Sequence, residues 1–372
     1  MEGDLIRINK KLLPLSWLYG FGVGIRNFLF DINVLKSRTY EIPIINIGNI
    51  TVGGTGKTPH TEYLLRLFLK DYKVAVLSRG YKRKSSGYQL ATPDTPMKYI
   101  GDEPWQMKQK FPQAYVAVDK NRRNGIRHLC NDAETKDVDI ILLDDAYQHR
   151  WVRPTTNILL IDYHRMVTDD KLLPAGRLRE DVSAIHRANI VIVTKCPHDI
   201  KPMDFRVVQK ALALRPYQEL YFSTFRYGHL TPLMGGEKRT LDSLHNNEHI
   251  LLLTGIASPE QMMIDIKQHT NHITPLSFPD HHYFSKRDVN RIEQMLETLP
   301  APRIIVTTEK DAARLRQNEN LSDNLKRLIY ILPIEVEIMR NEQEIFNKKI
   351  KAHVLKDSRN SILAEGKNGK CP

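Results

Sequence analysis

The segment GNITVGGTGKTP, residues 48–59, constrains the fold of this chain more than any other stretch of its sequence. It stands between an apolar run at residues 42–47 and a helix-like segment at residues 60–70. A glycine-rich loop between a strand and a helix can curl its backbone N–H groups around a phosphate, and the helix adds the positive end of its dipole. The segment therefore predicts a nucleotide-binding α/β fold.

The residues of this loop have separate expected tasks. Lys57 is expected to bridge the β- and γ-phosphates, and the hydroxyl of Thr58 to bind Mg²⁺. Thr51 stands where the usual pattern has its first glycine, which leaves the Gly-Lys-Thr chemistry intact. A plain glycine-rich turn is the alternative. The residues expected around ATP are Thr51, Val52, Gly53, Gly54, Thr55, Gly56, Lys57 and Thr58.

Short β-branched runs recur along the chain, and a turn and a helix-like stretch follow each of them. Runs without polar alternation indicate strands buried on both faces, and their alternation with helices indicates a doubly wound parallel sheet. The pattern restarts after about residue 220, which predicts a second, smaller α/β unit. The first expected strands cover residues 42–47, 73–77, 115–118, 138–143, 157–161 and 190–194.

At 372 residues the chain is long enough for one large or two medium domains. We expect four parts. They are an amphipathic membrane-associating segment at residues 1–35, a P-loop nucleotide-binding domain at 36–220, a smaller α/β domain with a two-stranded linker at 221–338, and a C-terminal helix and tail at 339–372.

The N-terminal part contains a mostly apolar stretch at residues 12–30, which follows Lys10 and Lys11. Pro14, Arg26 and several glycines interrupt it, so a cleaved signal peptide or a cleanly apolar spanning helix is disfavoured. Its aromatic residues and flanking cations favour a segment that lies in the membrane interface. A helix packed on the domain core is the alternative.

The formal net charge of +12 suggests a negative partner, such as nucleic acid, anionic lipid or a phosphorylated small molecule. Cations scattered over the surface for solubility are the alternative. No nucleic-acid recognition module can be recognised, so we expect no nucleic-acid partner. The three cysteines lie far apart without metal-ligand spacing, which disfavours disulfides and zinc and favours a reducing compartment.

Two pairs of carboxylates are candidates for chemistry. Asp144 and Asp145 directly follow a buried run, where a nucleotide site needs an acidic residue to orient Mg²⁺. A solvated turn is the alternative. Asp102 and Glu103 lie in a turn closed by Pro104, and Asp102 is either a base for a hydroxyl proton or a helix cap.

Basic and histidine side chains leave more alternatives open. The arginines that could neutralise a transferring phosphate, or pair with surface acids, are Arg79, Arg122, Arg177 and Arg179. His281 and His282 follow an expected strand and lie between aromatic residues, where they could tune a carboxylate or serve a structural role.

Eight segments in one order resemble the tetraacyldisaccharide 4'-kinases, which phosphorylate the lipid A precursor at the inner face of the bacterial inner membrane. The resemblance covers about residues 42–315. The segments are GNITVGGTGKTP, SRGYKRK, GDEPWQM, DDAYQHR, PAGRLRE, TGIASPEQM, FPDHHYF and TTEKDAARL. Lys82 departs from the RGYG pattern of relatives, whereas the absent first glycine of the loop is a trait of the family.

The resemblance implies ATP as donor, Mg²⁺ as cofactor, and the 4'-hydroxyl of a membrane-embedded tetraacylated disaccharide 1-phosphate as acceptor. It implies Asp102 and His281 as the acid-base pair, beside Lys57 and Arg179, and adds Gln148 to the ATP site. The metal ligands expected from strand position and resemblance together are Thr58, Asp144, Asp145 and Glu180. We expect a monomer at the cytoplasmic face of the inner membrane, peripheral or anchored by its N-terminal segment.

Two other nucleotide-dependent functions compete with this interpretation. An ATP-driven switch would hydrolyse ATP without an acceptor and would need no base at Asp102. A GTP-dependent regulator is disfavoured because the strand end at residues 191–197 lacks the Asn-Lys-x-Asp pattern that binds guanine.

Overall fold

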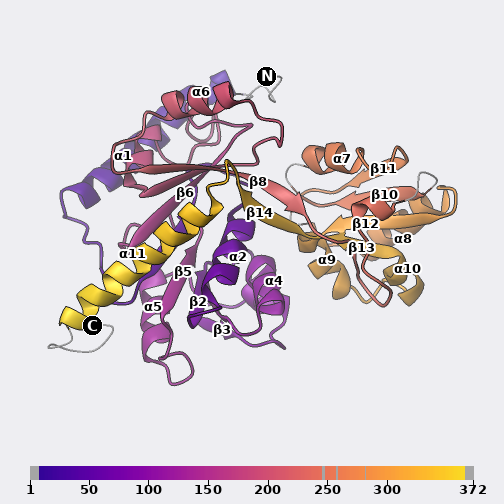
Figure 1. Cartoon of the computed structure of the whole chain (residues 1–372), viewed down its shortest axis with the longest axis horizontal. Helices are drawn as coiled ribbons and strands as arrows, with labels where there is room; N and C mark the ends of the chain where they lie inside the picture. Colours follow the sequence, from indigo (N-terminus) through magenta and orange to yellow (C-terminus); the bar gives the residue numbers. More distant parts are fainter. Residues whose placement is uncertain (1–7, 245–247, 257–258, 281, 365–372) are drawn as a thin grey trace. The chain divides into compact units, whose positions relative to one another are not determined.

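The computed structural model describes residues 8–244, 248–256, 259–280 and 282–364, without the side chains of residues 260 and 356–364. The chain divides into two compact units, which Figure 1 shows in sequence colours. The larger unit comprises Met1–Phe225 and Val336–Pro372, and the smaller unit comprises Arg226–Glu335. The chain leaves the larger unit in strand β8 (Glu219–Tyr227) and returns in strand β14 (Ile334–Ile338).

The larger unit is built on a nine-stranded sheet in the order β14-β8-β7-β6-β1-β5-β2-β4-β3. The strands from β8 to β4 in this order pair in parallel, whereas the edge strand β3 is antiparallel to β4. Besides β8 and β14, the strands are β1 (Ile44–Gly48), β2 (Val74–Ser78), β3 (Gln89–Ala91), β4 (Tyr115–Val118), β5 (Ile140–Asp144), β6 (Thr156–Asp162) and β7 (Ile190–Thr194).

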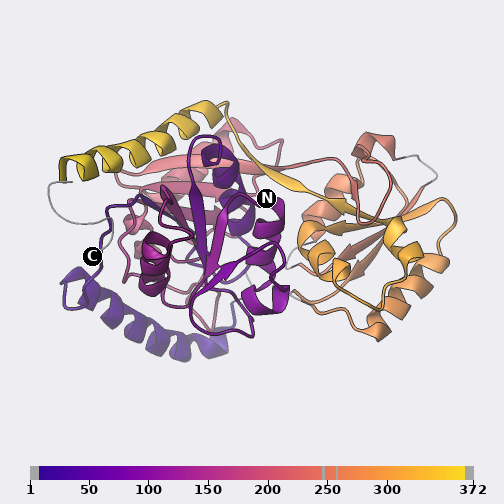
Figure 2. The ribbon, with the colours of Figure 1, turned by 90° about the horizontal axis from the view of Figure 1, so that it is seen from below.

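Helices cover both faces of this sheet, and Figure 2 shows α1 and α11 on opposite sides of it. One core packs Ile126 and Leu129 of α5 against β2 and β5, and another packs Val208 and Leu212 of α6 against β6 and β7. The helices are α1 (Leu13–Asp31), α2 (Lys57–Phe68), α3 (Met97–Ile100), α4 (Asp102–Lys110), α5 (Arg122–Asn131), α6 (Pro202–Leu212) and α11 (Gln343–Ala364), with the 3₁₀ turns η1 (Lys10–Leu12) and η2 (Val182–Arg187).

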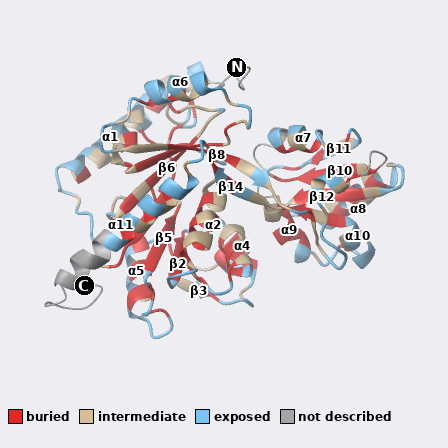
Figure 3. Cartoon of the chain, in the orientation of Figure 1, coloured by how far each residue is buried: buried red, intermediate tan, exposed pale blue. Residues whose placement is uncertain are grey.

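The smaller unit has a five-stranded sheet in the order β11-β10-β12-β13-β9, parallel except for β9. Its central strands β10 and β12 are mostly buried, whereas the edge strand β11 is mostly intermediate or exposed (Figure 3). The strands are β9 (Thr231–Pro232), β10 (His249–Thr254), β11 (Ile273–Ser277), β12 (Arg303–Thr308) and β13 (Ile329–Leu332). The helices are η3 (Leu241–Ser243), α7 (Glu260–Ile266), α8 (Lys286–Glu297), α9 (Glu309–Arg316) and α10 (Asp323–Leu328).

The predicted fold, a doubly wound parallel sheet with a second, smaller α/β domain, is confirmed. In the larger sheet β1 lies between β6 and β5, and the chain continues from β1 through α2 to β2 on the β5 side. Open α/β sheets bind ligands at the carboxyl ends of strands where the strand order reverses in this way. The fold therefore predicts a ligand site at the loop that follows β1 and at the end of β5.

Candidate active site

The loop between β1 and α2 places its left-handed backbone at two glycines. Gly53 has a φ of 120° and Gly56 a φ of 83°, in a region that glycine adopts at little cost. A Cβ added to Gly56 would also lie 2.9 Å from the Phe225 ring. Because α2 begins at Lys57, the free N–H groups of its first turn face this loop.

Thr51, at the position of the missing first glycine, lies in extended backbone. It forms an antiparallel bridge with Leu178, and the amide of Val52 donates to the carbonyl of Arg177 at 2.8 Å. An extended residue has no need of positive φ, so threonine is compatible with this position. The first half of the loop is thus held as a strand segment, and only its second half curls.

Asn49 and His60 brace the loop from two sides. The Asn49 amide donates to Oγ1 of Thr55 at 2.8 Å, and the Asn49 carbonyl accepts from Nε2 of Gln148 at 2.7 Å. Burial lowers the pKa of His60 to about 4, so the ring is neutral and its Nδ1–H donates to the carbonyl of Gly56. Sequence reasoning missed both residues as parts of the site, although Asn49 belongs to the family's loop pattern.

Asp145 and Lys57 meet where β5 ends beside the loop. Oδ1 of Asp145 lies 3.6 Å from Nζ of Lys57 and 3.1 Å from Nη1 of Arg179. Burial opposes ionisation of Asp145, but the two cations prevail and hold its pKa below the ordinary value. Asp145 is therefore a carboxylate that holds the loop lysine and Arg179 close together.

Asp144 has a different environment from its neighbour. Its side chain is buried, Oδ2 accepts from Oγ of Ser78 at 3.1 Å, and Oδ1 has no hydrogen-bond partner among the described residues. Burial, together with the Glu103 and Asp145 carboxylates, raises its pKa to about 7. A buried carboxyl oxygen without a donor is costly, and a cation would satisfy it.

Helix α4 brings the predicted base to the same edge of the sheet. Asp102 is its first residue, and the influence of Glu103 on Asp144 places the start of α4 beside the end of β5. Glu103 is a site residue that sequence reasoning named in the turn but did not assign. Among the described residues no three His, Cys, Asp or Glu side chains form a metal-binding group. A cation here would therefore take its remaining ligands from phosphate and water, as Mg²⁺ usually does.

Glu62 ties the helix that begins at Lys57 to the helix that begins at Asp102. It is a buried residue of α2 that accepts hydrogen bonds from Gln106 at 2.9 Å and from Lys110 at 2.6 Å, both in α4. A charged contact therefore joins the middle of α2 to the C-terminal half of α4.

Glu180 has the environment of a structural carboxylate. It is fully buried, and Oε1 accepts from Arg26 at 3.0 Å and from Asn27 at 2.9 Å, both in α1. Oε2 accepts from Arg187 at 2.5 Å and from Gln148 at 3.5 Å. Since both oxygens are occupied by protein donors, Glu180 links α1 to the loop region through Gln148.

Positive charge gathers beside this edge of the sheet. Arg122 is buried and donates to the carbonyl oxygen of Asp144 at 3.1 Å. Burial, followed by the charges of Arg122, Arg123, Arg26 and Arg79, lowers the pKa of His149 to about 4. His149 is therefore neutral at pH 7, and the surrounding guanidinium groups favour an anion.

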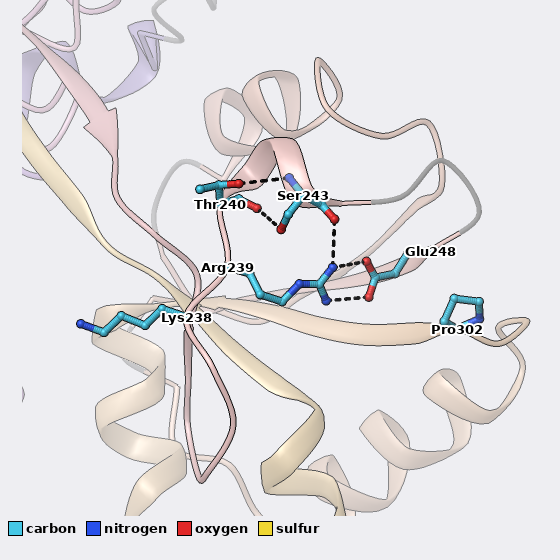
Figure 4. Close-up of a pocket in the computed structure, with 6 residues that line it drawn as sticks. All are labelled: Lys238, Arg239, Thr240, Ser243, Glu248 and Pro302. Atoms are coloured by element: carbon cyan, nitrogen blue, oxygen red, sulfur yellow. Dashed lines mark hydrogen bonds and ion pairs between the residues drawn. The ribbon is translucent and has the colours of Figure 1, made fainter.

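The smaller unit contains the predicted histidine in its sequence and has a hollow of its own. His281 lies outside the described residues. His282 is held in place, because Nε2 lies 3.0 Å from Oδ2 of Asp288 and its ring stacks on Phe278. A hollow of about 510 Å³ shows Arg239 paired with Glu248 (Figure 4), and none of the predicted site residues lines it.

Similarity to known proteins covers nearly the whole chain. The model of the family described as LpxK, tetraacyldisaccharide-1-P 4'-kinase, matches residues 8–354. A tetraacyldisaccharide 4'-kinase of Phocaeicola vulgatus is 55% identical over 363 residues, which cover 97% of this chain and 99% of that protein. One of Bacteroides thetaiotaomicron is 52% identical over 377 residues and covers 99% of each chain.

A solved structure is similar as well. The crystal structure of LpxK from Aquifex aeolicus in complex with ATP matches with a TM-score of 0.71 at 28% identity. The match covers 92% of this chain and 98% of that chain.

Proposed function

The chain belongs to the tetraacyldisaccharide-1-P 4'-kinase family, and from this premise we propose how its residues carry out the reaction. It transfers phosphate from ATP to the 4'-hydroxyl of a tetraacyldisaccharide 1-phosphate, a lipid A precursor. One observation carries the assignment of residues: Lys57, Asp145 and the Asp144 oxygen that has no partner in the described part of the chain gather at the end of β5 beside the loop.

We assign the donor phosphates to the loop of residues 51–58. Its backbone amides and the first turn of α2 supply N–H donors, and Lys57 leaves Asp145 to contact phosphate oxygens. Arg179 lies 3.1 Å from the same carboxylate, so its guanidinium can stabilise the negative charge that develops on the phosphate during transfer. Gln148 keeps the start of the loop in place through the carbonyl of Asn49.

For Mg²⁺ we propose Thr58 and Asp144 as direct ligands, with Asp145 close by. When bound, the ion would neutralise phosphate charge during transfer. Oδ1 of Asp144, which accepts no hydrogen bond from the residues that the structure describes, is the observation that fits a cation best. For Glu180 we replace the expected role of metal ligand by a positioning role, because protein donors occupy both of its oxygens.

We propose Asp102 as the base that accepts the proton of the sugar hydroxyl, with His281 as its partner in the acid-base pair. Asp102 begins α4, and the Glu62 contact fixes this helix start relative to Lys57. Transfer in line requires the acceptor oxygen and the donor phosphate to be held at a set separation. The α2–α4 contact supplies this separation from within one unit.

We propose that α1 docks on the membrane surface that contains the acceptor. None of the helices in the described residues combines the length and apolar character that crossing a membrane requires. However, α1 exposes Trp17 at 72%, Leu18 at 69% and Phe21 at 69% of their surface, although most large apolar side chains of this unit are buried. Changing these three residues to serine should abolish co-sedimentation with vesicles, whereas unchanged co-sedimentation would contradict docking through α1.

The experiment that tests the function is direct. Purified protein is incubated with γ-labelled ATP, Mg²⁺ and a tetraacyldisaccharide 1-phosphate in neutral detergent, and the lipid product is analysed for a phosphate at the 4' position. We expect label in the lipid and slow ATP consumption without acceptor. Equal ATP consumption with and without acceptor, and an unmodified lipid, would support the ATP-driven switch instead.

A further inference from the structure

The segment that precedes the predicted base forms an exposed patch of cations and aromatic rings. Lys82, Lys84 and Lys98 are exposed, and so are Tyr81 and Tyr99. We call these five residues the Lys-Tyr patch. Nζ of Lys82 lies 5.6 Å from the centre of the Tyr81 ring, and Nζ of Lys98 lies 5.2 Å from that of Tyr99.

Backbone contacts hold the patch together and join it to the turn that directly precedes Asp102. The amide of Lys84 donates to the carbonyl of Lys98 at 2.8 Å, which couples the loop after β2 to α3. A Cβ added to Gly101 would lie 3.0 Å from the carbonyl oxygen of Tyr81. The patch therefore rests against the residue directly before Asp102.

The cations of the patch have no carboxylate within ion-pair distance among the described residues. Within the part of the chain that the structure describes, Lys82, Lys84 and Lys98 form no ion pair with a carboxylate. Some other lysines of this chain do, including Lys73, Lys110, Lys195 and Lys351. Three unpaired cations on one exposed surface attract a multiply charged anion.

Lys82 also occupies a backbone conformation that favours glycine. Its φ is 56°, in the left-handed region that costs conformational energy for a residue with a Cβ. A lysine stands at this position despite that cost, next to the Tyr81 ring and close to the predicted base. Local strain of this kind, together with unpaired charge, is typical of a binding surface.

We propose that the Lys-Tyr patch binds the 1-phosphate of the acceptor disaccharide, a site that would complement the 4'-hydroxyl at Asp102. The inference rests on the proposed function, which places one end of the acceptor at Asp102. The family description gives the acceptor a phosphate at its other end. Lysines supply the charge-assisted hydrogen bonds that a phosphate monoester accepts, and the tyrosine rings supply flat apolar surface for the sugar beside it.

The test compares two acceptors that differ only in the charge of this group. One is the tetraacyldisaccharide 1-phosphate, and the other has a hydroxyl in place of the phosphate. Kinetics are measured in neutral detergent, so that anionic lipid is absent. The variants are Lys82→Gly with Lys98→Ala, Lys82→Arg, and Lys136→Ala as an exposed control far from the patch in sequence.

Lys82→Gly is the informative change, because glycine relieves the positive φ while it removes the charge. We expect the Lys82→Gly, Lys98→Ala variant to lose about tenfold in kcat/KM for the 1-phosphate acceptor, through KM, since two charged hydrogen bonds are removed. For the 1-hydroxyl acceptor we expect a loss of less than about twofold. Lys82→Arg and Lys136→Ala should resemble the wild type with both acceptors.

Three outcomes would overturn the proposal. Equal losses of kcat/KM for both acceptors would show that the patch affects loop structure. No loss of kcat/KM for either acceptor would show that the charge of the patch does not contribute to acceptor binding. Loss of binding to anionic vesicles without discrimination between acceptors would assign the cations to membrane headgroups. Failure of the wild type to phosphorylate either acceptor would refute the proposed function itself, which is a separate result.

Discussion

Each of the two parallel sheets has a buried aspartate near the carboxyl ends of its strands, and the surroundings of the two aspartates differ. In the larger unit Oδ1 of Asp144 has no partner among the described residues. In the smaller unit Oδ2 of Asp311 accepts from the amide of Gly255 and from Oγ1 of Thr308, both at 2.8 Å, and Oδ1 accepts from Arg314 at 3.0 Å.

The comparison distinguishes a sheet end that carries out chemistry from a sheet end that only stabilises the fold. Burial raises the pKa of both aspartates, and hydrogen bonds and cations act against the shift in each case: Gly255, Thr308 and Arg314 at Asp311, and Lys57 and Ser78 at Asp144. Asp144 also faces the further negative charges of Glu103 and Asp145. A protein tolerates this arrangement when a ligand supplies the missing cation, so we place the chemistry in the larger unit.

The largest expected effect is the loss of activity in Asp144→Asn. The amide keeps the size of the side chain but removes the charge that would orient Mg²⁺, so we expect kcat to fall by about 10³-fold. Steady-state phosphorylation of the acceptor at saturating ATP measures this. Activity within about threefold of the wild type would remove Asp144 from the site.

A smaller but still large loss is expected for Asp102→Asn. Removal of a general base costs about 10²- to 10³-fold in kcat, while ATP binding should be unchanged because Asp102 lies outside the loop. Single-turnover rates and ATP titration separate the two quantities. If ATP affinity fell in parallel with the rate, Asp102 would belong to the donor site instead.

Asp311→Asn should have the opposite character, with a loss of stability and little loss of chemistry. The amide oxygen can still accept from Gly255 and Thr308, but the NH2 group then replaces the oxygen that accepts from Arg314, so the buried guanidinium loses its acceptor and its counter-charge. We expect the free energy of unfolding to fall by about 2 kcal/mol. Denaturant unfolding measures this, and a wild-type midpoint would show that Asp311 is not the structural residue of the comparison.

The sequence predicted the strands that carry the site because their apolar runs are continuous. The run at residues 138–143 became β5 (Ile140–Asp144), and the expected strand at 115–118 is β4 (Tyr115–Val118). The sequence also identified Lys57, Asp144 and Asp145 as neighbours, since parallel strands end at one edge. Short elements such as β3 (Gln89–Ala91) lack such a run and were not predicted.

Contacts between distant segments could not be predicted in the same way. The resemblance implies Glu180 as a metal ligand, whereas the donors that contact it, which come from α1, Gln148 and Arg187, could not be predicted from the sequence. Likewise, the extended conformation of Thr51 depends on its bridge to Leu178, 127 positions away (178 − 51). These features depend on tertiary packing, which local patterns do not encode.

The smallest expected effect is the contribution of Asp144 to the pH dependence of stability. Its pKa is about 7 in the folded chain and near 3.8 when unperturbed, so the folded state binds a proton that the unfolded state releases between these values. The contribution of Asp144 to stability without ligand should therefore fall as pH rises from about 4 to about 7. His60 and His149, whose pKa values are lowered to about 4, contribute in the opposite sense in the wild type and in the variant alike. The free energy of unfolding of Asp144→Asn minus that of the wild type should therefore rise over this range. At pH 8 we expect this variant to be about 1–2 kcal/mol more stable than the wild type.

Thermal unfolding at pH 8, with and without Mg²⁺ and ATP, tests most directly whether the unsatisfied end of the larger sheet is the nucleotide site. We predict that without ligand the wild type unfolds at a lower temperature than Asp144→Asn. Mg²⁺ and ATP should raise the unfolding temperature of the wild type by several degrees and that of Asp144→Asn only a little. A variant that starts below the wild type and gains as much from the ligand would contradict the account.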